Sequence, residues 1–360
     1  MHYDAIRKML HEHPGISGDE HYAHDLIVNT LSDLHPDRVY DHVGGNGVIA
    51  VWGQQQSNPT IAIRGDIDAL PIGHRCGHDG HAAILLQLAS LINTRDIPSG
   101  INVILIFQPE EETGTGSQKI LDAGILQQYN IRAIFGFHNL PGYPLGTVVL
   151  NRHTFAAAST GVIYRLTGRE THASTPEEGI NPGLATADII RRFQALNKNP
   201  FDDSDNFTQA TLIRIDLGDE AFGTSAGQAY LMFTLRAYSN NTMSRLIESA
   251  NNIVAETAKQ YGLACEVGYR DPFNATENNS SWVEYIESCC MCRYQYNITP
   301  FRWSEDFANY LIQFPGAFFG IGAGEHHVEL HHPDYDFPDA LILPAAQVCF
   351  NLITDFLQTK

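Results

Sequence analysis

Short apolar runs alternate with helical segments through the first half of the chain. Four apolar runs predict buried strands, at Val48–Trp52, Thr60–Arg64, Asn102–Phe107 and Ile131–Phe137. The segment His81–Asn93 lies between the second and third strands and predicts a helix that fills most of that connection. Strands that alternate with helices in this way indicate a layered α/β sheet.

A different order of elements begins near Thr160. It contains a strand, a helix, two strands, a helix and a last strand, which is the β-α-β-β-α-β order of ferredoxin-like domains. The six elements are expected at Thr160–Thr167, Pro182–Asn197, Thr211–Leu217, Ala229–Tyr238, Thr242–Tyr261 and Leu263–Arg270.

The α/β pattern resumes after Asp271, with a helix expected at Ser280–Tyr294 and a strand at Ala317–Ile321. A chain of 360 residues is also longer than the roughly 250–300 residues at which one hydrophobic core stops growing. We therefore expect a catalytic domain formed by residues 1–159 and 272–360, interrupted by an inserted domain at residues 160–271.

The charge balance argues against two classes of partner. The chain has 22 basic and 41 acidic residues, for a formal charge of −19, which repels phosphate backbones and anionic lipids. The most apolar helical run, Ile84–Ile92, is too short to span a bilayer, and Met1–Gly15 lacks the apolar core of a signal peptide. We expect a cytoplasmic protein that binds neither nucleic acid nor membrane.

Three of the six cysteines crowd together at Cys289, Cys290 and Cys292, a spacing unlike that of a disulfide framework. A soft-metal or redox cluster is one hypothesis for them. Reduced thiols packed in a helix are the favoured hypothesis, because free cysteine behaves as a small hydrophobic residue.

Residues of metal-binding type follow three of the predicted strands directly. Because ligands collect at the carboxyl ends of strands in α/β sheets, these side chains are expected to meet and to bind metal. They are Asp66, Asp68, Cys76, His78 and His81 after the second strand, Glu110, Glu111 and Glu112 after the third, and His138 after the fourth, with further histidines at residues 326–332.

The number of donors favours two metal ions. A single catalytic zinc needs about three protein ligands, whereas Cys76, His78, His138, a C-terminal histidine and one or two glutamates supply more. Two ions about 3.5–4 Å apart can activate water and polarise a carbonyl group, provided that one carboxylate stays off the metal as general base. Chemistry alone leaves open which glutamate of the triplet 110–112 does so.

These residues resemble the M20 metallopeptidase family, in particular its aminoacylase/amidohydrolase branch, which includes hippurate hydrolases, auxin-conjugate amidohydrolases, carboxypeptidases and N-acetyl-amino-acid deacetylases. The matched segments follow the order of the family along nearly the whole chain. They are Arg64–Pro71, Cys76–His81, Phe107–Glu112, Gly136–His138, Gly168–Pro176, Ser304–Phe307 and Leu330–Pro333.

The resemblance implies roles for individual residues. It implies two divalent metal ions, with zinc, manganese, nickel or cobalt as candidates, and ligands at Cys76, His78, Glu112, His138 and His331. Glu111 matches the general base of the family, and Asp68, together with Asp66, matches the acidic pair that orients the ligands. His331 is preferred to His332 because it follows a leucine and precedes a residue and then a proline.

The inserted domain carries the motif Gly168–Pro176, in which His172 matches the family histidine that stabilises the oxyanion. The resemblance implies that this domain serves as a lid and as the surface of a homodimer. The family pattern is altered at Glu177, at Asn181 and at residues 223–227. The loop Ile72–Arg75 is also shorter than in the family, so we expect a pocket that is more open or is shaped by another segment.

The leading hypothesis is hydrolysis of the amide bond of a small N-acyl amino acid or peptide-like substrate. A dipeptidase or carboxypeptidase with the same centre is the alternative among enzymes. A catalytically silent metal-binding protein that uses the lid for interactions is the alternative from another class. Glu111 and His172 argue against silence, because a storage site needs neither a base nor an oxyanion donor.

Overall fold

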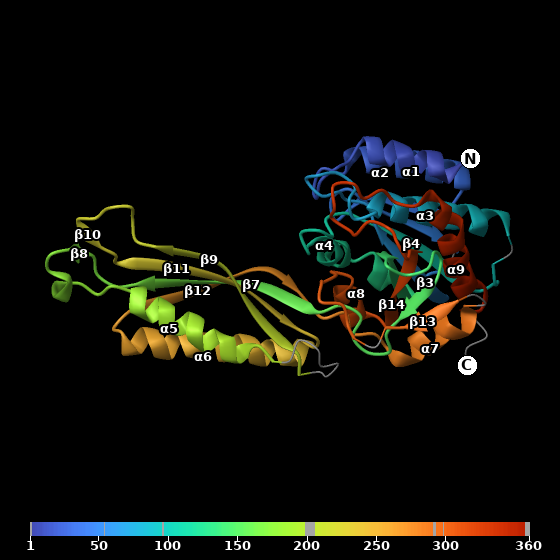
Figure 1. The fold of residues 1–360 in the computed structure, drawn as a ribbon. Coiled ribbons are helices and arrows are strands. Elements are labelled where there is room, and N and C mark those ends of the chain that lie inside the picture. The colour runs from blue at the N-terminus through green and yellow to red at the C-terminus, as the bar shows by residue number, and fades with distance from the viewer. Residues whose placement is uncertain are drawn as a thin grey trace. The chain divides into compact units, whose positions relative to one another are not determined.

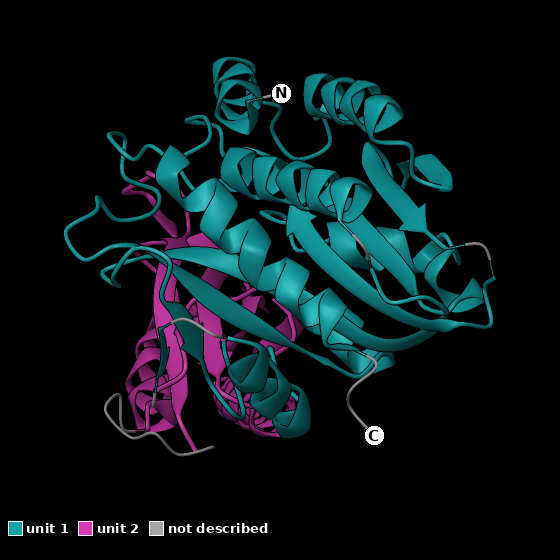
Figure 2. Cartoon of the chain, turned by 90° about the vertical axis from the view of Figure 1, so that its right-hand side faces the viewer, with its two compact units in different colours: residues 1–155, 276–298, 306–360 teal, residues 156–275, 299–305 magenta. Residues whose placement is uncertain are grey.

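The computed structural model describes residues 2–53, 55–95, 97–198, 206–290, 293–297 and 299–356. The chain forms two compact units (Figure 2). Unit 1 comprises residues 1–155, 276–298 and 306–360, and unit 2 comprises residues 156–275 and 299–305.

Over the described residues, unit 1 is built on an eight-stranded sheet in the order β1-β2-β4-β3-β5-β14-β6-β13. Strands β3, β4, β5 and β14 at its centre run parallel to their neighbours in this group, as buried strands linked by helices require. The four predicted strands of the first half are confirmed as β2 to β5. The bounds are β1 Arg38–Val43, β2 Gly47–Trp52, β3 Pro59–Asp66, β4 Asn102–Gln108, β5 Asn130–Pro141, β6 Val148–Leu150, β13 Tyr294–Tyr296 and β14 Gly316–Gly324.

Helix α3 lies at the centre of unit 1 and contacts α1, α2, α9 and strand β3 (Figure 1). It is apolar on most sides because neighbours cover it on most sides. The helices of this unit are α1 Tyr3–Glu12, α2 His21–Leu34, α3 His78–Thr94, α4 Gly116–Asp122, α7 Ser280–Cys289, α8 Ala308–Gln313 and α9 Ile342–Thr354, with short 3₁₀ turns at Leu126–Gln128 and Asp339–Leu341.

A helix was predicted at Ser280–Tyr294, and the prediction was too long, because α7 ends at Cys289. Tyr294 instead begins β13, whose three residues pair in parallel with β6 and so extend the edge of the sheet. This pairing satisfies the backbone of an aromatic segment that suits a strand better than a helix. Cys289 and Cys290 are buried at the end of α7, and Cys292 lies outside the described residues.

Unit 2 has the element order β7-α5-β9-β11-α6-β12, with an antiparallel sheet in the order β12-β7-β11-β9 and both helices on one face of it (Figure 1). The six elements predicted here occur in the predicted order. Their bounds are β7 Ala158–Thr167, α5 Gly183–Phe193, β9 Thr208–Leu217, β11 Gln228–Ala237, α6 Asn240–Gln260 and β12 Ala264–Phe273. The short strands β8 Thr171–His172 and β10 Thr224–Ser225 pair with each other, and 3₁₀ turns lie at Pro176–Glu178 and Gln194–Leu196.

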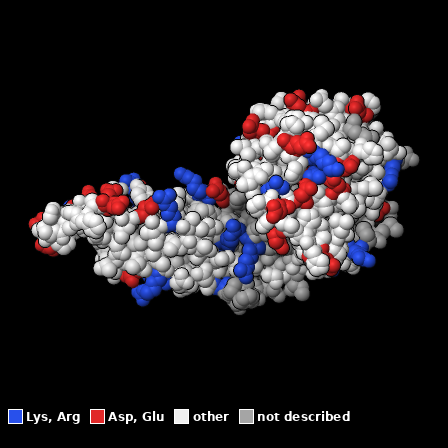
Figure 3. Space-filling view, turned by 45° about the horizontal axis from the view of Figure 1, so that its top comes forward, with Lys and Arg blue, Asp and Glu red and all other residues white. Residues whose placement is uncertain are grey.

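Among the described residues, no helix has the length and apolar character needed to cross a membrane. On the face shown in Figure 3, acidic side chains are spread over both units and are interspersed with basic ones. The net negative charge therefore belongs to the general surface on this face and is not gathered in one patch.

Candidate metal centre

The centre lies where β3, β4 and β5 end. These strands are parallel neighbours, with Asp66 in register with Gln108 on β4, so the segments that follow them meet at one edge of the sheet. Asp68 follows β3, the glutamate triplet follows β4, and His138 lies within β5. The expectation that these side chains converge is confirmed by the geometry of the unit.

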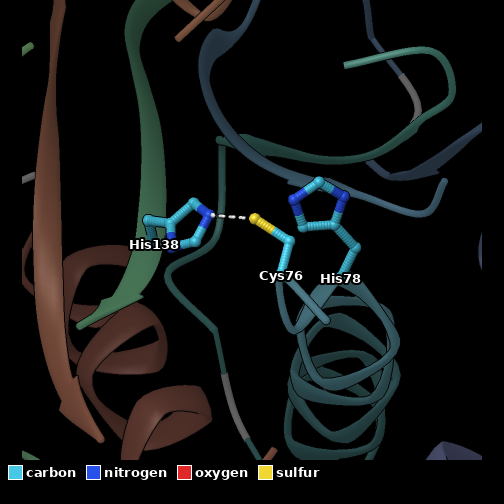
Figure 4. Close-up of side chains that lie close together, drawn as sticks. All are labelled: Cys76, His78 and His138. Atoms are coloured by element: carbon cyan, nitrogen blue, oxygen red, sulfur yellow. Dashed lines mark hydrogen bonds between the residues drawn. The ribbon is translucent and has the colours of Figure 1, made fainter. Parts of the chain in front are cut away.

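Cys76 and His78 are brought to this edge by the start of α3 (Figure 4). The turn requires Gly77, which has φ +96° and whose Cβ, were there one, would lie 2.7 Å from Oδ1 of Asn139. The Sγ atom of Cys76 lies 3.6 Å from Nε2 of His138 and 3.3 Å from Nε2 of His331. Two histidines from distant parts of the chain therefore lie beside one thiol.

The two buried imidazoles present the correct nitrogen to this space. Nδ1–H of His138 donates to the carbonyl oxygen of Asn139 at 2.8 Å, and Nδ1–H of His78 donates to that of Asp68 at 3.1 Å. In each ring Nε2 is therefore the nitrogen left to bind a cation.

Glu112 lies between two of the histidines. Its Oε1 atom is 3.9 Å from Nε2 of His78 and 3.9 Å from Nε2 of His331. Within the described part of the chain, Oε1 of Glu112 and Nε2 of His78 are buried without a hydrogen-bond partner. Buried polar atoms without partners are costly, so their convergence fits a bound cation.

The donors form two groups that share the thiol, one of Cys76, His78 and His138 and the other of Cys76, Glu112 and His331, each with ligand atoms within 4.8 Å of one another. Thiolate, imidazole and carboxylate together suit divalent ions of the zinc type. Burial raises the pKa of Cys76 well above its ordinary value, so the thiolate needs a nearby cation. The residues present thus fit divalent metal ions.

The three glutamates of the triplet have different partners. Glu110 has φ +55°, and its carboxylate pairs with Nζ of Lys119 at 2.6 Å. Glu111 and Glu112 instead lie with His78 in one group of potential ligands. Glu111 is buried, and its Oε1 atom accepts a hydrogen bond from the backbone N–H of Asp306 at 3.4 Å.

Asp68 and Asp66 both lie close to His78, one of the candidate ligands. Oδ1 of Asp68 lies 3.3 Å from Nδ1 of His78, and its Oδ2 accepts hydrogen bonds from Ser17 Oγ at 2.7 Å and from the backbone N–H of Glu112 at 3.0 Å. Burial alone would raise the pKa of Asp66, but His78, His81 and Arg64 outweigh it and hold that pKa well below its usual range. Burial alone would lower the pKa of His78, but the charges of Asp66 and Cys76 raise it well above its ordinary value. The buried carboxylates therefore give the site a negative charge that a proton on His78 or a bound metal ion can neutralise.

A buried chain of hydrogen bonds behind the candidate ligands was not expected from the sequence. His81 bonds to Asp66 through Nδ1 and to Oδ1 of Asn139 through Nε2, the latter at 2.6 Å. Asn139 in turn donates to the hydroxyl of Tyr335. Nothing in the sequence around His81 or Tyr335 indicates these contacts, because no local pattern signals contacts across such separations.

Arg64 joins the buried residues beneath the site by hydrogen bonds. Its fully buried guanidinium donates to Asp66 Oδ2 at 2.7 Å, to Asp306 Oδ1 at 2.9 Å and to Gln108 Oε1 at 2.8 Å. The side chain of Gln108 also donates to both oxygens of Asp306, each at 2.9 Å. Asp306 thus fixes the segment that contacts Glu111.

The short loop Ile72–Arg75 contacts the C-terminal histidine segment. The carbonyl oxygen of Arg75 accepts a hydrogen bond from the backbone N–H of His331 at 2.7 Å, and Nη1 of Arg75 donates to the carbonyl oxygen of Tyr335 at 2.5 Å. His331 has φ +65° and its Nε2 lies 3.3 Å from the thiol, whereas the ring of His332 accepts a hydrogen bond from the backbone N–H of Asp334 at 3.1 Å; both side chains are exposed.

His172 lies in unit 2, on strand β8, and is exposed. Its Nδ1 atom accepts a hydrogen bond from the backbone N–H of Ser174 at 3.1 Å and lies 2.6 Å from the hydroxyl of that residue. Since a backbone N–H can only donate, the neutral ring carries its proton on Nε2. The side chain is therefore prepared as a hydrogen-bond donor.

Residues 62–355 match the model of peptidase family M20/M25/M40. An N-acetylcysteine deacetylase of Bacillus subtilis (strain 168) is 28% identical over 371 residues, which cover 98% of this chain and 96% of that protein. The crystal structure of a dinuclear metal-binding peptidase of the M20 family from Bacillus subtilis is 26% identical and has a TM-score of 0.86, covering 99% of this chain and 98% of its own.

A more distant structure shares the fold. An aminobenzoyl-glutamate utilization protein from Klebsiella pneumoniae is 21% identical and has a TM-score of 0.75, with 99% of this chain and 97% of that chain covered.

Proposed function

Because this chain belongs to peptidase family M20/M25/M40 and is a metal-dependent amidohydrolase, we propose that it cleaves the amide bond of small N-acyl amino acids. The similarity to an N-acetylcysteine deacetylase supports this class of substrate. The observation that carries the proposal is the position of Glu111, a buried carboxylate beside His78 and Glu112 that the two donor groups sharing Cys76 do not need.

We assign five residues to hold two divalent metal ions. They are Cys76, His78, Glu112, His138 and His331, with the thiol common to both donor groups. When bound, such ions lower the pKa of water and polarise the carbonyl oxygen of a substrate. The donor set admits zinc, manganese, nickel or cobalt.

Glu111 is the proposed general base. Its carboxylate takes the proton from the attacking water and returns it to the amide nitrogen as the C–N bond breaks. The hydrogen bond from the backbone of Asp306 restricts its orientation, and the Arg64 network fixes Asp306. Asp68 is the proposed positioning residue, since it contacts both His78 and the backbone of Glu112.

His172 is the proposed oxyanion donor. Its Nε2–H follows from the bond that Ser174 makes to Nδ1, and an N–H donor is what a developing negative oxygen requires. With this assignment, we propose that the domain at residues 160–271 serves as a lid.

We also propose that this domain forms a homodimer. Exposed apolar residues on β9, namely Leu212, Ile213, Ile215 and Leu217, support a contact surface there. Sedimentation velocity should give the mass of two chains; a single-chain mass at micromolar concentration would refute this part.

The test of the function compares two neighbouring glutamates. Glu111→Gln should keep the bound metal and lower turnover by about 10²- to 10⁴-fold, because the amide cannot accept the proton. Glu110→Gln is the matched control, since Glu110 pairs with Lys119 and should leave turnover nearly unchanged. Near-normal activity of Glu111→Gln would remove the base assignment.

Substrate class is tested on the same preparations, loaded with each candidate metal in turn. N-acetyl amino acids should be hydrolysed in preference to dipeptides. The reverse preference would favour a dipeptidase or carboxypeptidase. A metal-loaded protein inert to both series would favour the catalytically silent alternative.

A further inference from the structure

A second group of potential ligands lies away from the strand ends, between α2 and the edge strand β1. It consists of His24 on the helix and of Asp41 and His42 on the strand, with one ligand atom of each within 4.8 Å of the others. It shares no residue with the centre around Cys76. Neither the matches to known proteins nor the proposed function gives it a role.

His24 has the hydrogen-bonding arrangement of a metal ligand. Its side chain is almost wholly buried, and Nδ1 lies 3.0 Å from Oδ1 of Asp25. A neutral ring that donates from Nδ1 to a carboxylate keeps its lone pair on Nε2, which is how ligating histidines are usually oriented. Among the described residues, Nε2 of His24 is buried without any hydrogen-bond partner. A buried nitrogen with a free lone pair is costly unless something binds it.

The backbone of β1 is bent to bring His42 to the same place. Tyr40 pairs with Ile49 and Val43 with Gly47, so two residues of β1, Asp41 and His42, oppose one residue of β2. This is a β-bulge, a device that redirects a side chain at the edge of a sheet. His42 has φ +49°, a left-handed conformation that a residue with a Cβ rarely adopts. Its ring stacks on that of His24, with centroids 4.0 Å apart and an interplanar angle of 18°, so the exposed ring of His42 has to rotate about its side-chain bonds before both nitrogens can bind one ion.

We propose that His24, Asp41 and His42 form a second metal site, which binds a zinc-type divalent ion and ties α2 to the edge strand β1. Two imidazoles and one carboxylate favour Zn²⁺, Co²⁺, Ni²⁺ or Cu²⁺ over Mg²⁺ and Ca²⁺, which prefer oxygen ligands. Three protein ligands leave a coordination position for water. Because Asp41 and His42 are exposed, the ion can enter directly from solvent.

The test uses a matched pair of exposed histidines with left-handed backbones. His42 has φ +49° and His35, at the C-terminal end of α2, has φ +45°, so glycine relieves the same strain at both positions. Equilibrium dialysis against Zn²⁺, followed by metal analysis, should show one equivalent less metal bound to His42→Gly than to the wild type. His35→Gly should bind as much as the wild type. An unchanged zinc content in His42→Gly would overturn the proposal.

Co²⁺ identifies which site is lost. The centre around Cys76 contains a thiol, so cobalt there gives a thiolate-to-metal charge-transfer band, whereas the second site contains only nitrogen and oxygen donors. His42→Gly should lose visible absorption of bound cobalt while it keeps the charge-transfer band and the hydrolytic activity. Loss of the charge-transfer band instead would mean that the variant damaged the catalytic centre, and would count against a separate site.

Asp41→Ala, at another exposed position, repeats the measurement independently of the backbone change. It should weaken or abolish binding of the same equivalent. Full retention of zinc in this variant, with circular dichroism unchanged, would also overturn the three-ligand assignment. These outcomes do not depend on whether N-acyl amino acids are the substrate.

Discussion

The two units fill their interiors with different chemistry. In unit 2 the buried cluster between the sheet and helices α5 and α6 is apolar, and its largest members include Tyr164, Phe193 and Phe233. Unit 1 has an apolar core as well, but it also buries Arg64, Asp66 and Asp306, whose charges are paired with one another. Buried charges cost desolvation free energy and persist only where geometry and hydrogen bonds compensate for it. The difference teaches that unit 1 gives up stability to hold a reactive site, whereas unit 2 is organised mainly by apolar packing.

The largest expected effect comes from removing the cation at the centre of this network. Arg64→Met leaves the carboxylates of Asp66 and Asp306 buried without it, and should lower the free energy of unfolding of unit 1 by about 3–5 kcal/mol. Urea denaturation of metal-free protein, followed by hydrogen exchange of the β3 and α6 amides, assigns the loss to a unit.

The control in unit 2 is Arg192→Met. Arg192 pairs with Glu256 at 2.6 Å, but the side chain of Glu256 is 67% exposed, so the pair should contribute no more than about 1 kcal/mol. Equal losses of stability in the two variants would contradict the contrast between the units.

The parts of the molecule that follow local rules were predictable from the sequence. Apolar runs identified β2 to β5, and donors placed directly after them identified the edge at which the metal centre lies. The proximity of Cys76 and His138 could be predicted because parallel neighbouring strands end at the same edge of a sheet. These inferences need only the period of a strand and the direction of its chain.

Contacts between distant segments were not predictable in the same way. The bond of Arg64 to Asp306 joins residues 242 positions apart, and nothing in the spacing of either marks it. Residue chemistry alone left the choice between Glu110 and Glu111 open, because it depends on a left-handed backbone at Glu110 and on Lys119, and only the family resemblance favoured Glu111. His24 and His42 carry no motif, and only the bulge in β1 brings them together.

A smaller effect, confined to mildly acidic solution, should sharpen the comparison further. His74 lies in the short loop Ile72–Arg75 of unit 1, and burial lowers its pKa to about 4 from the ordinary 6.5. Over the described residues, neither nitrogen of its ring has a hydrogen-bond partner. As the pH falls from about 6.5 to about 4, the unfolded chain takes up a proton that the folded chain refuses, so stability declines across this window.

The difference between the two pKa values corresponds to a loss of about 3 kcal/mol in the free energy of unfolding once the pH has fallen to about 4. His74→Leu, which removes the titrating ring and suits an apolar setting, should flatten the pH dependence of unfolding between these limits in chelator-treated protein. His21→Leu, at an exposed position of α2, should keep the dependence of the wild type. If His74→Leu loses stability on acidification as steeply as the wild type does, the sensitivity of unit 1 lies elsewhere in its charged network, and the loop histidine is buried without consequence for pH.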